Sequence, residues 1–192
     1  LIGTPQSIKD LHWGDVLFYF YQGEYLPSLT RLGAAQEFDR LENHAVEAEL
    51  LKGGLYLSLG QHEEAGRIFK ALLNDNVPLD VRNRAWFYLG KVWYARGYLD
   101  RAERAISEVR GRLTADLEAE RLHLLSNILM RQQRFDEAIA LLTSHYDDLQ
   151  KTKYGRLVSE FAALLATAYR ATRNAALVRQ YAQRPGEGAG RS

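Results

Sequence analysis

Histidines and neighbouring carboxylates are the side chains with which this chain could hold a metal ion or transfer protons. The five histidines are His12, His44, His62, His123 and His145. None of them forms the i,i+4 pair or the His-Glu-x-x-His pattern that places two imidazoles on one helical face. His12 and Asp15 share a helical face, but a single pair of this kind more often makes a solvated contact than a metal site. The sequence therefore predicts no metal site.

The acidic pairs and the glycine run also have explanations that involve no catalysis. Glu63–Glu64 and Asp147–Asp148 fall at expected helix starts, where carboxylates interact favourably with the helix dipole. The run Gly186–Gly190 follows a helix and precedes none, which is the wrong context for a phosphate-binding loop. No nucleophile, base and orienting group can be assembled from the sequence. We therefore expect no enzymatic activity and no cofactor.

Composition narrows the classes of partner. The 192 residues include no cysteine, which excludes disulfides, thiolate metal sites and cysteine nucleophiles, and fits either the cytosol or an oxidising compartment. Residues 1–96 carry 10 basic and 12 acidic side chains, and residues 97–192 carry 15 and 12. This distribution gives no basic stripe, so we expect no nucleic-acid binding. No apolar run reaches the roughly 18 residues that a membrane span needs.

Three glycines set the organisation of the elements that carry these residues. Gly23, Gly60 and Gly97 stand 37 residues apart (60 − 23 = 37 and 97 − 60 = 37), each between two helix-like segments. A fixed period of roughly 20 to 50 residues is typical of a chain that stacks one supersecondary unit. Each glycine falls where a first helix must stop with a positive φ. In a fourth unit, Gln133 occupies the glycine slot (133 − 97 = 36).

The residues around this period resemble the tetratricopeptide repeat, whose pattern runs Trp-x2-Leu-Gly-x2-Tyr, then alanine, then an aromatic residue. The third unit matches best, with Trp86, Leu89, Gly90, Trp93 and Ala102. The second unit keeps the glycine, tyrosine, alanine and aromatic positions at Gly53, Tyr56, Ala65 and Phe69. The resemblance covers roughly residues 9–145. The family's usual period is about 34, so each unit here is expected to hold about three extra residues.

The sizes of the residues at equivalent positions of the repeat predict how its two helices pack. Two helices of a hairpin must approach within about 8–10 Å, and small residues are expected where they do so: Gly53, Gly90, Ala65 and Ala102. Large residues are expected to fill the gaps between hairpins: Tyr56, Trp86, Trp93 and Phe69.

We predict an all-α fold, a right-handed α-solenoid of about five tetratricopeptide-like helical hairpins. The expected helix pairs are 7–22 with 25–41, 43–59 with 62–73, 80–96 with 99–113, 114–132 with 135–144, and 147–171 with 174–184. The array forms one domain over residues 1–184, and residues 185–192 form a disordered tail or linker. No stretch shows the alternation of a strand.

The resemblance also implies which residues line the concave side of the stack. These are the position after the tryptophan slot and the positions four and seven or eight residues further along each first helix. Carried over to this sequence, they are Trp13, Leu17, Phe20 and Tyr21; Leu50, Gly54 and Leu57; Phe87, Lys91 and Tyr94; and His123, Asn127, Met130 and Arg131. The set is rich in aromatic and apolar residues, as a peptide- or helix-binding groove should be. The alternative is that several of them pack between hairpins, because a longer unit can rotate its faces.

Some family members bind a partner's terminal carboxylate with lysine, asparagine and arginine on the first helices. Lys91, Asn127 and Arg131 are the groups here that could attempt it, but they do not follow the pattern of that clamp. Arg84 stands at one clamp-like position, and Tyr88 replaces the basic residue four positions on. We therefore expect no terminal-carboxylate clamp.

These observations predict a non-catalytic scaffold or adaptor that binds a protein or peptide partner in its concave groove. The alternative is a structural or assembly module, a homo-oligomer or a fragment of a larger cell-envelope protein, or a domain that positions a catalytic domain; the start at Leu1 and the glycine-rich tail motivate it. The segments 10–21 and 50–57 resemble uncharacterised proteobacterial tetratricopeptide proteins of the cell envelope. That resemblance implies a periplasmic location, with the cytoplasm as the alternative.

Overall fold

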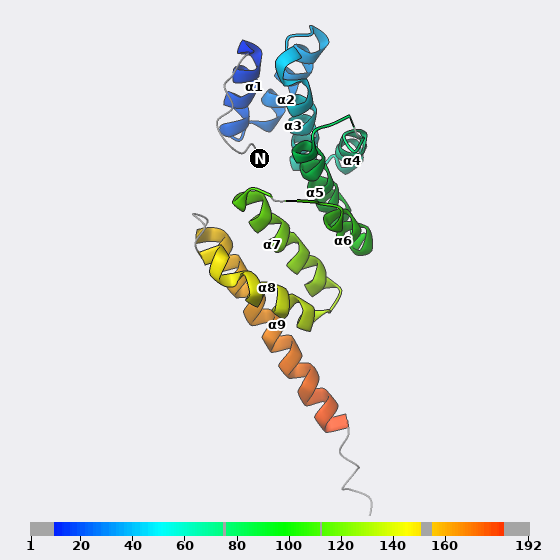
Figure 1. Ribbon diagram of the computed structural model, residues 1–192, viewed down its shortest axis with the longest axis vertical. Coiled ribbons are helices and arrows are strands. Elements are labelled where there is room, and N and C mark those ends of the chain that lie inside the picture. Colours follow the sequence, from blue (N-terminus) through cyan, green and yellow to red (C-terminus); the bar gives the residue numbers. More distant parts are fainter. Residues whose placement is uncertain (1–9, 75, 112, 151–154, 183–192) are drawn as a thin grey trace, which may run out of the picture. The chain divides into compact units, whose positions relative to one another are not determined.

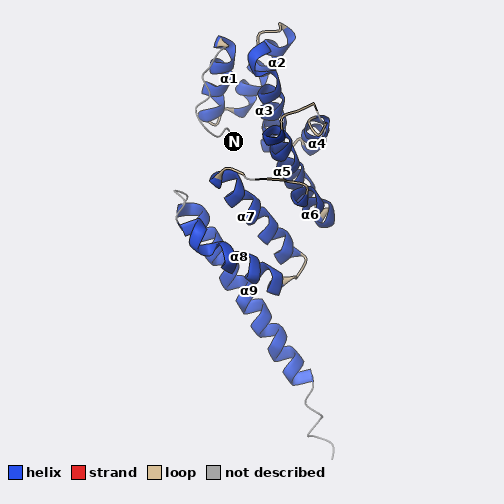
Figure 2. Ribbon diagram, viewed as in Figure 1, coloured by secondary structure: helices blue, strands red, loops and turns tan. Residues whose placement is uncertain are grey.

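The computed structural model describes residues 10–74, 76–111, 113–150 and 155–182. Within these ranges the regular elements are all helical, and no strand is present (Figure 2). The helices are α1 (Leu11–Tyr21), α2 (Tyr25–Glu37), the short η1 (Glu42–His44), α3 (Ala45–Ser58), α4 (His62–Ala71), α5 (Leu79–Ala95), α6 (Leu99–Ser107), α7 (Ala115–Arg131), α8 (Phe135–Gln150) and α9 (Gly155–Ala182). The predicted all-α, helical-hairpin architecture is confirmed.

Contacts between helices divide the chain into two compact units, Leu1–Thr114 and Ala115–Ser192. In the first unit, α1 packs against α2, α3 against α4, and α5 against α6, and neighbouring hairpins meet where α2 contacts α3 and where α5 contacts α3 and α4 (Figure 1). In the second unit, α7, α8 and α9 all contact one another. The extent of one array over residues 1–184 stays a prediction, and the tail at 185–192 lies outside the described residues.

Residues with a positive φ end the first helix of each hairpin. In the first unit they have φ of 76°, 76° and 82° and are Gly23, Gly60 and Gly97. The Gly97 N–H donates to the Tyr94 carbonyl at 3.0 Å, and the Tyr98 N–H donates to the Trp93 carbonyl at 2.9 Å. These two bonds satisfy carbonyls that the helix end leaves without partners. Gln133, with φ 60°, closes α7 with the same pair of bonds, so it does occupy the glycine slot.

The predicted close approach within hairpins is also present. A Cβ on Gly53 of α3 would lie 2.6 Å from Cε1 of Phe69 on α4, and a Cβ on Gly90 of α5 would lie 2.8 Å from Cδ1 of Ile106 on α6. Ala65, on the second helix, has no exposed surface. Glycine at the first-helix positions lets the partner side chain pack directly on the backbone, which brings the two helices of each hairpin together.

One buried cluster holds the first two hairpins together. It is formed by Trp13, Val16, Phe20, Leu32, Ala35, Leu41, Ala48, Leu51 and Leu55. The Trp13 ring stacks on His44 with 5.3 Å between ring centroids, and the buried Ser28 hydroxyl donates to the Val16 carbonyl at 2.9 Å. The aromatic residues of α1 therefore join this hairpin to the next one through apolar burial, with one buried hydrogen bond tying α2 to α1.

The last helix differs from the prediction. A helix pair with a break near Asn174 was expected, but α8 continues to Gln150 and α9 runs without interruption over Gly155–Ala182. The expected break is wrong because α9 is rich in alanine, the strongest helix former, while a single asparagine costs only a fraction of a kcal/mol, about 0.7 at most. The described residues thus form four hairpins followed by α9.

No helix in the described ranges combines the length and the apolar character that crossing a membrane requires. This holds for α9 as well, although it is the longest of these helices. Its apolar side instead packs inside the second unit, where Phe161 joins Ala119, Leu122 and Leu142 in a buried cluster.

Candidate functional site

The position ten residues before each glycine is buried in every hairpin of the first unit. Trp13, Leu50 and Phe87 occupy it (23 − 13 = 10, 60 − 50 = 10 and 97 − 87 = 10) and are 1%, 4% and 0% exposed. Phe87 packs edge-to-face on Tyr88, with 5.2 Å between ring centroids. A side chain without exposed surface cannot contact a partner. The structure therefore assigns these three residues to packing between helices, which was the alternative left open by the sequence.

Two further residues of the expected groove, Phe20 and Gly54, belong to the interior, and Leu17 is half-buried against it. Phe20 is 9% exposed and lies in the buried cluster of the first two hairpins, and Leu17 packs against the same cluster while keeping part of its surface. Gly54 is buried within α3. Phe20 and Gly54 therefore lie beneath the surface, whereas Leu17 keeps some of its side chain accessible.

The remaining candidates of the first unit keep accessible side chains. Tyr21 is 65% exposed, and Leu57, Lys91 and Tyr94 are half-buried. We name these four residues the first-helix surface, because they come from α1, α3 and α5, the first helices of three consecutive hairpins. The Lys91 ammonium lies 5.3 Å from the ring centre of Phe87, a cation–π contact that holds the lysine stem over the buried aromatic.

The four candidates on α7 belong to the second unit. The His123 Nε2 lies 3.3 Å from an oxygen of Glu160 on α9, and its ring packs edge-to-face on Phe161. The Asn127 side-chain amide donates to the His123 carbonyl at 2.9 Å. Met130 is half-buried, and Arg131 is exposed in the last turn of α7. His123 and Asn127 thus make contacts that join helices or turns inside this unit.

Asp15 and Glu64, two of the carboxylates considered for chemistry, form ion pairs on the surface. Asp15 accepts a hydrogen bond from Arg31 at 3.1 Å, which ties α1 to α2. Arg134, which directly precedes α8, donates two hydrogen bonds to Glu137 and thereby lowers the pKa of that exposed carboxyl. Within α4, Arg67 donates one hydrogen bond to Glu64. In the part of the chain that the structure describes, no group of three potential metal ligands comes together.

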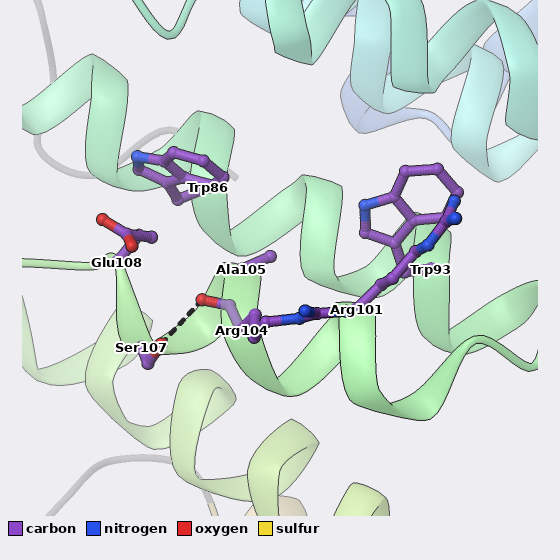
Figure 3. A pocket seen from close by; sticks show the side chains of 7 residues that line it. All are labelled: Trp86, Trp93, Arg101, Arg104, Ala105, Ser107 and Glu108. Carbon is purple, nitrogen blue, oxygen red and sulfur yellow. Dashed lines mark hydrogen bonds between the residues drawn. The ribbon is translucent and has the colours of Figure 1, made fainter.

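The structure also shows a cavity that the sequence did not predict. It has a volume of about 270 Å³ and lies on the α5–α6 hairpin (Figure 3). Its lining residues are Trp86, Trp93, Arg101, Arg104, Ala105, Ser107 and Glu108. The sequence had assigned Trp86 and Trp93 to the gaps between hairpins, but both are half-buried and face this cavity. The sequence analysis did not identify these two residues as lining a cavity, because the repeat pattern has a tryptophan at the position of Trp86 and assigns it to packing.

The cavity has an aromatic side and a charged side. Trp86 and Trp93 stand seven residues apart on α5, so they share one face about 10.5 Å from each other along the helix axis. Ala105 of α6 lines the space and is too small to fill it. The Arg101 guanidinium lies 5.1 Å from the ring centre of Trp93 and 5.2 Å from that of Tyr98. This arrangement can hold an apolar group between the indoles and an anion beside the guanidinium.

Comparison with known proteins bears on the fold. No protein-family model matches the chain, and the search of curated proteins gives no match. Among solved structures, the chain is similar to the crystal structure of MamA, with a TM-score of 0.53 and 15% sequence identity over 90% of this chain and 99% of that one. At this identity the likeness shows the fold alone, and it supports a tetratricopeptide-like helical solenoid.

Proposed function

We propose that the chain is a non-catalytic scaffold that binds a segment of a partner protein on its first-helix surface. The observation that carries this proposal is the division of the first helices into buried and accessible positions. Trp13, Leu50 and Phe87 are closed off in the core, while Leu57 and Tyr94, at one equivalent position of α3 and α5, remain accessible. The hairpins thus present partly exposed apolar and aromatic side chains on rigid helices.

The accessible aromatic and apolar side chains of the first-helix surface favour binding of a partner protein. Half-buried aromatic side chains carry a large share of the energy in protein interfaces, and they lose little conformational entropy when a partner covers them. Tyr94 has this character, and Lys91 beside it supplies a charge held by its cation–π contact. Because the scaffold beneath is fully packed, binding requires little reorganisation of the hairpins.

The test is site-specific crosslinking followed by measurement of affinity. A photo-reactive amino acid placed at Tyr94 is expected to capture a protein partner that mass spectrometry can identify. The same group at Tyr169, an exposed tyrosine on α9, is the matched control. The purified partner should then bind the Tyr94→Ala variant at least about tenfold more weakly, as expected for an interface residue that contributes about 1.4 kcal/mol or more.

The variants must leave the fold intact for this test to be decisive. Phe87→Ala is unsuitable, because removing a fully buried aromatic side chain costs about 3–5 kcal/mol of stability. Tyr94→Ala removes a half-buried one, and circular dichroism checks its helicity. Equal affinity of Tyr94→Ala and Tyr169→Ala for the captured partner would disprove the proposal.

Self-association is the second candidate, and one observation favours it. The first hairpin carries three large apolar side chains that are mostly exposed: Leu11 at 86%, Phe18 at 58% and Leu26 at 63%. Large apolar side chains left exposed on one hairpin favour an interface there. If this hairpin mediates assembly, multi-angle light scattering should show a concentration-dependent mass for the native chain and a monomer for Phe18→Glu. A native chain that stays monomeric over a wide concentration range would exclude this candidate.

A further inference from the structure

We propose that the cavity on α5–α6 binds an acidic segment of a partner protein, in which one apolar side chain enters between the two indoles and neighbouring carboxylates reach the basic side chains. We name the cavity the α5–α6 pocket. It is separate from the first-helix surface, since none of its lining residues belongs to that surface. The choice of a protein segment as the ligand rests on the proposed function, in which the chain binds a partner protein.

The shape of the pocket selects the apolar part of the ligand. Trp86 and Trp93 stand at either end of a space of about 270 Å³, and Ala105 contributes only a methyl group between them. A space of this size takes one side chain rather than a whole helix face. An aliphatic or aromatic group would gain contact with both indoles and would displace water from apolar surface.

The charges around Trp93 select the acidic part. Three cationic groups lie within 6 Å of this ring centre: the Lys70 ammonium at 5.0 Å, the Arg101 guanidinium at 5.1 Å and the Arg96 guanidinium at 5.6 Å. Arg96 also reaches Glu63 at 3.8 Å. Within the described residues, Lys70 and Arg101 make cation–π contacts but no ion pair with a carboxylate.

Arg104 adds a second guanidinium to the lining of the pocket. Its Nε donates to the Asp100 carbonyl of its own helix at 3.3 Å, which leaves the terminal nitrogens for another acceptor. Guanidinium groups bind carboxylates with two parallel hydrogen bonds, and an aromatic surface beneath them keeps them poorly hydrated. Lys70, Arg101 and Arg104 therefore complement a carboxylate-bearing segment.

The two ends of the pocket differ, which gives the ligand a direction. Figure 3 shows Arg101 beside Trp93 at one end and Glu108 near Trp86 at the other. Glu108 also lies 3.5 Å from the Arg110 guanidinium, an exposed ion pair that offsets only part of its charge, so a carboxylate at this end would still meet a like charge. The acidic residues of the ligand therefore belong at the Trp93 end, next to the apolar side chain that fills the pocket.

A nucleic acid is the other polyanion that aromatic and basic side chains attract. The observations favour an acidic peptide, because Glu108 lines the pocket and the whole chain has a formal charge of only +1. A sequence-independent nucleic-acid site needs a continuous basic surface along the backbone path. Binding of an oligonucleotide is therefore an outcome of the test that would overturn the proposal.

The test measures fluorescence anisotropy of a labelled probe with the full chain. The probe is a short synthetic peptide in which a glutamate block precedes a single leucine. Two matched peptides replace the leucine by alanine or the glutamates by lysines, and a single-stranded oligothymidine is the fourth probe. We expect the acidic leucine peptide to bind most tightly and its affinity to fall as salt is added, since exposed charges are screened.

Protein variants separate the pocket from unspecific charge effects. Arg101→Glu should weaken binding of the acidic leucine peptide about tenfold, whereas Arg40→Glu should leave it within about twofold. Arg40 is a matched control, since its guanidinium also lies over an exposed aromatic ring, that of Phe38, at 4.9 Å. Glu108→Gln should strengthen binding, because it removes the like charge, and Ala105→Leu should weaken it by filling the space.

Each outcome decides the proposal. An equal loss in Arg101→Glu and Arg40→Glu, no preference for leucine over alanine, or Arg101-dependent binding of the oligonucleotide in place of the peptide would overturn it. The Tyr94→Ala variant is expected to bind the acidic leucine peptide normally. Failure at the pocket can thus be told apart from failure at the first-helix surface. Circular dichroism and thermal melting of each variant confirm that it is folded.

Discussion

Two glycines inside helices of the first unit differ in whether packing requires them. At Gly53 in α3, a Cβ would lie 2.6 Å from the ring of Phe69, which is fully buried and stacked on Tyr88 with 5.4 Å between ring centroids. At Gly33 in α2, a Cβ would meet no atom within 4 Å. The first glycine is required by packing between helices, whereas the second one only lowers helix propensity.

This difference makes a paired prediction. Gly33→Ala should stabilise the fold by about 0.5–1 kcal/mol, since alanine loses less conformational freedom in a helix interior. Gly53→Ala should destabilise it by about 1–3 kcal/mol, because the enclosed Phe69 ring cannot move aside. Thermal melting followed by circular dichroism measures both, with an expected change of about 2–4 °C per kcal/mol for a chain of this size. A stabilised Gly53→Ala would contradict the close packing of α3 on α4.

Tryptophan takes different roles in the first and the third hairpin. Trp13 is 1% exposed and joins the core, while Trp86 and Trp93 are only partly buried and line the α5–α6 pocket. Trp13, Trp86 and Trp93 stand ten, eleven and four residues before the glycine that ends their helix (23 − 13 = 10, 97 − 86 = 11 and 97 − 93 = 4). Their roles separate only when the opposing helix is in place, because Ala105 leaves space where a larger side chain would have covered the indoles.

At the scale of the element, the first helix of every hairpin ends with the same pair of backbone bonds, and three of these ends use glycine. In α7 the same geometry is imposed on Gln133, which has φ 60°. A residue with a Cβ strains in this left-handed region by roughly 1–2 kcal/mol, and glycine does not. The backbone conformation at Gln133 therefore lowers the stability of the second unit, and other interactions in that unit must offset this.

Gln133→Gly should accordingly stabilise the second unit. Glycine's greater freedom in the unfolded chain offsets part of the relief, so the expected net gain is about 0.5–1 kcal/mol. The reverse change, Gly97→Ala, should destabilise the α5–α6 hairpin by a similar or larger amount. Chemical denaturation followed by circular dichroism gives both values, and Gln133→Ala serves as the control that keeps the strain. No difference between Gln133→Gly and Gln133→Ala would contradict the proposed strain.

At the scale of the whole molecule, the chain consists of two compact units divided after Thr114. The first contains three stacked hairpins with a buried core, and the second contains α7, α8 and α9 around Phe161 and its neighbours. Because each unit has its own apolar cluster, each satisfies the main requirement for folding by itself. The three tryptophans of the chain all lie in the first unit, so their fluorescence reports on that unit alone.

We therefore expect residues 1–114, expressed alone, to fold. The fragment should show helical circular dichroism and a cooperative thermal transition, because its hairpins bury their apolar faces against one another. Tryptophan fluorescence should give a melting midpoint for the fragment within about 5 °C of that of the full chain, a difference on the order of 1 kcal/mol. A fragment that is unfolded, or that melts without cooperativity, would show that the first unit depends on residues beyond Thr114.

The repeat was predictable from sequence because its main determinants are local. A left-handed residue at the end of each first helix and small residues at hairpin contacts leave a period in the sequence, and the structure confirms the φ values at Gly23, Gly60 and Gly97. The slot of Gln133 was found by a spacing one residue shorter (133 − 97 = 36). The helix break expected near Asn174 was wrong, because one residue of modest helix propensity does not interrupt the alanine-rich helix α9.

By itself, the sequence determined the helix–turn–helix unit, its period and the residues that stop each helix, because these depend on interactions within a few residues of the chain. Tertiary structure alone decided which side chains remain accessible. Phe87 and Tyr94 stand on the same helix at candidate positions, yet one is fully buried and the other is half-buried. Burial depends on what the neighbouring hairpin places opposite each residue, and that is set by packing between segments distant in sequence. The same packing opened the pocket between Trp86 and Trp93.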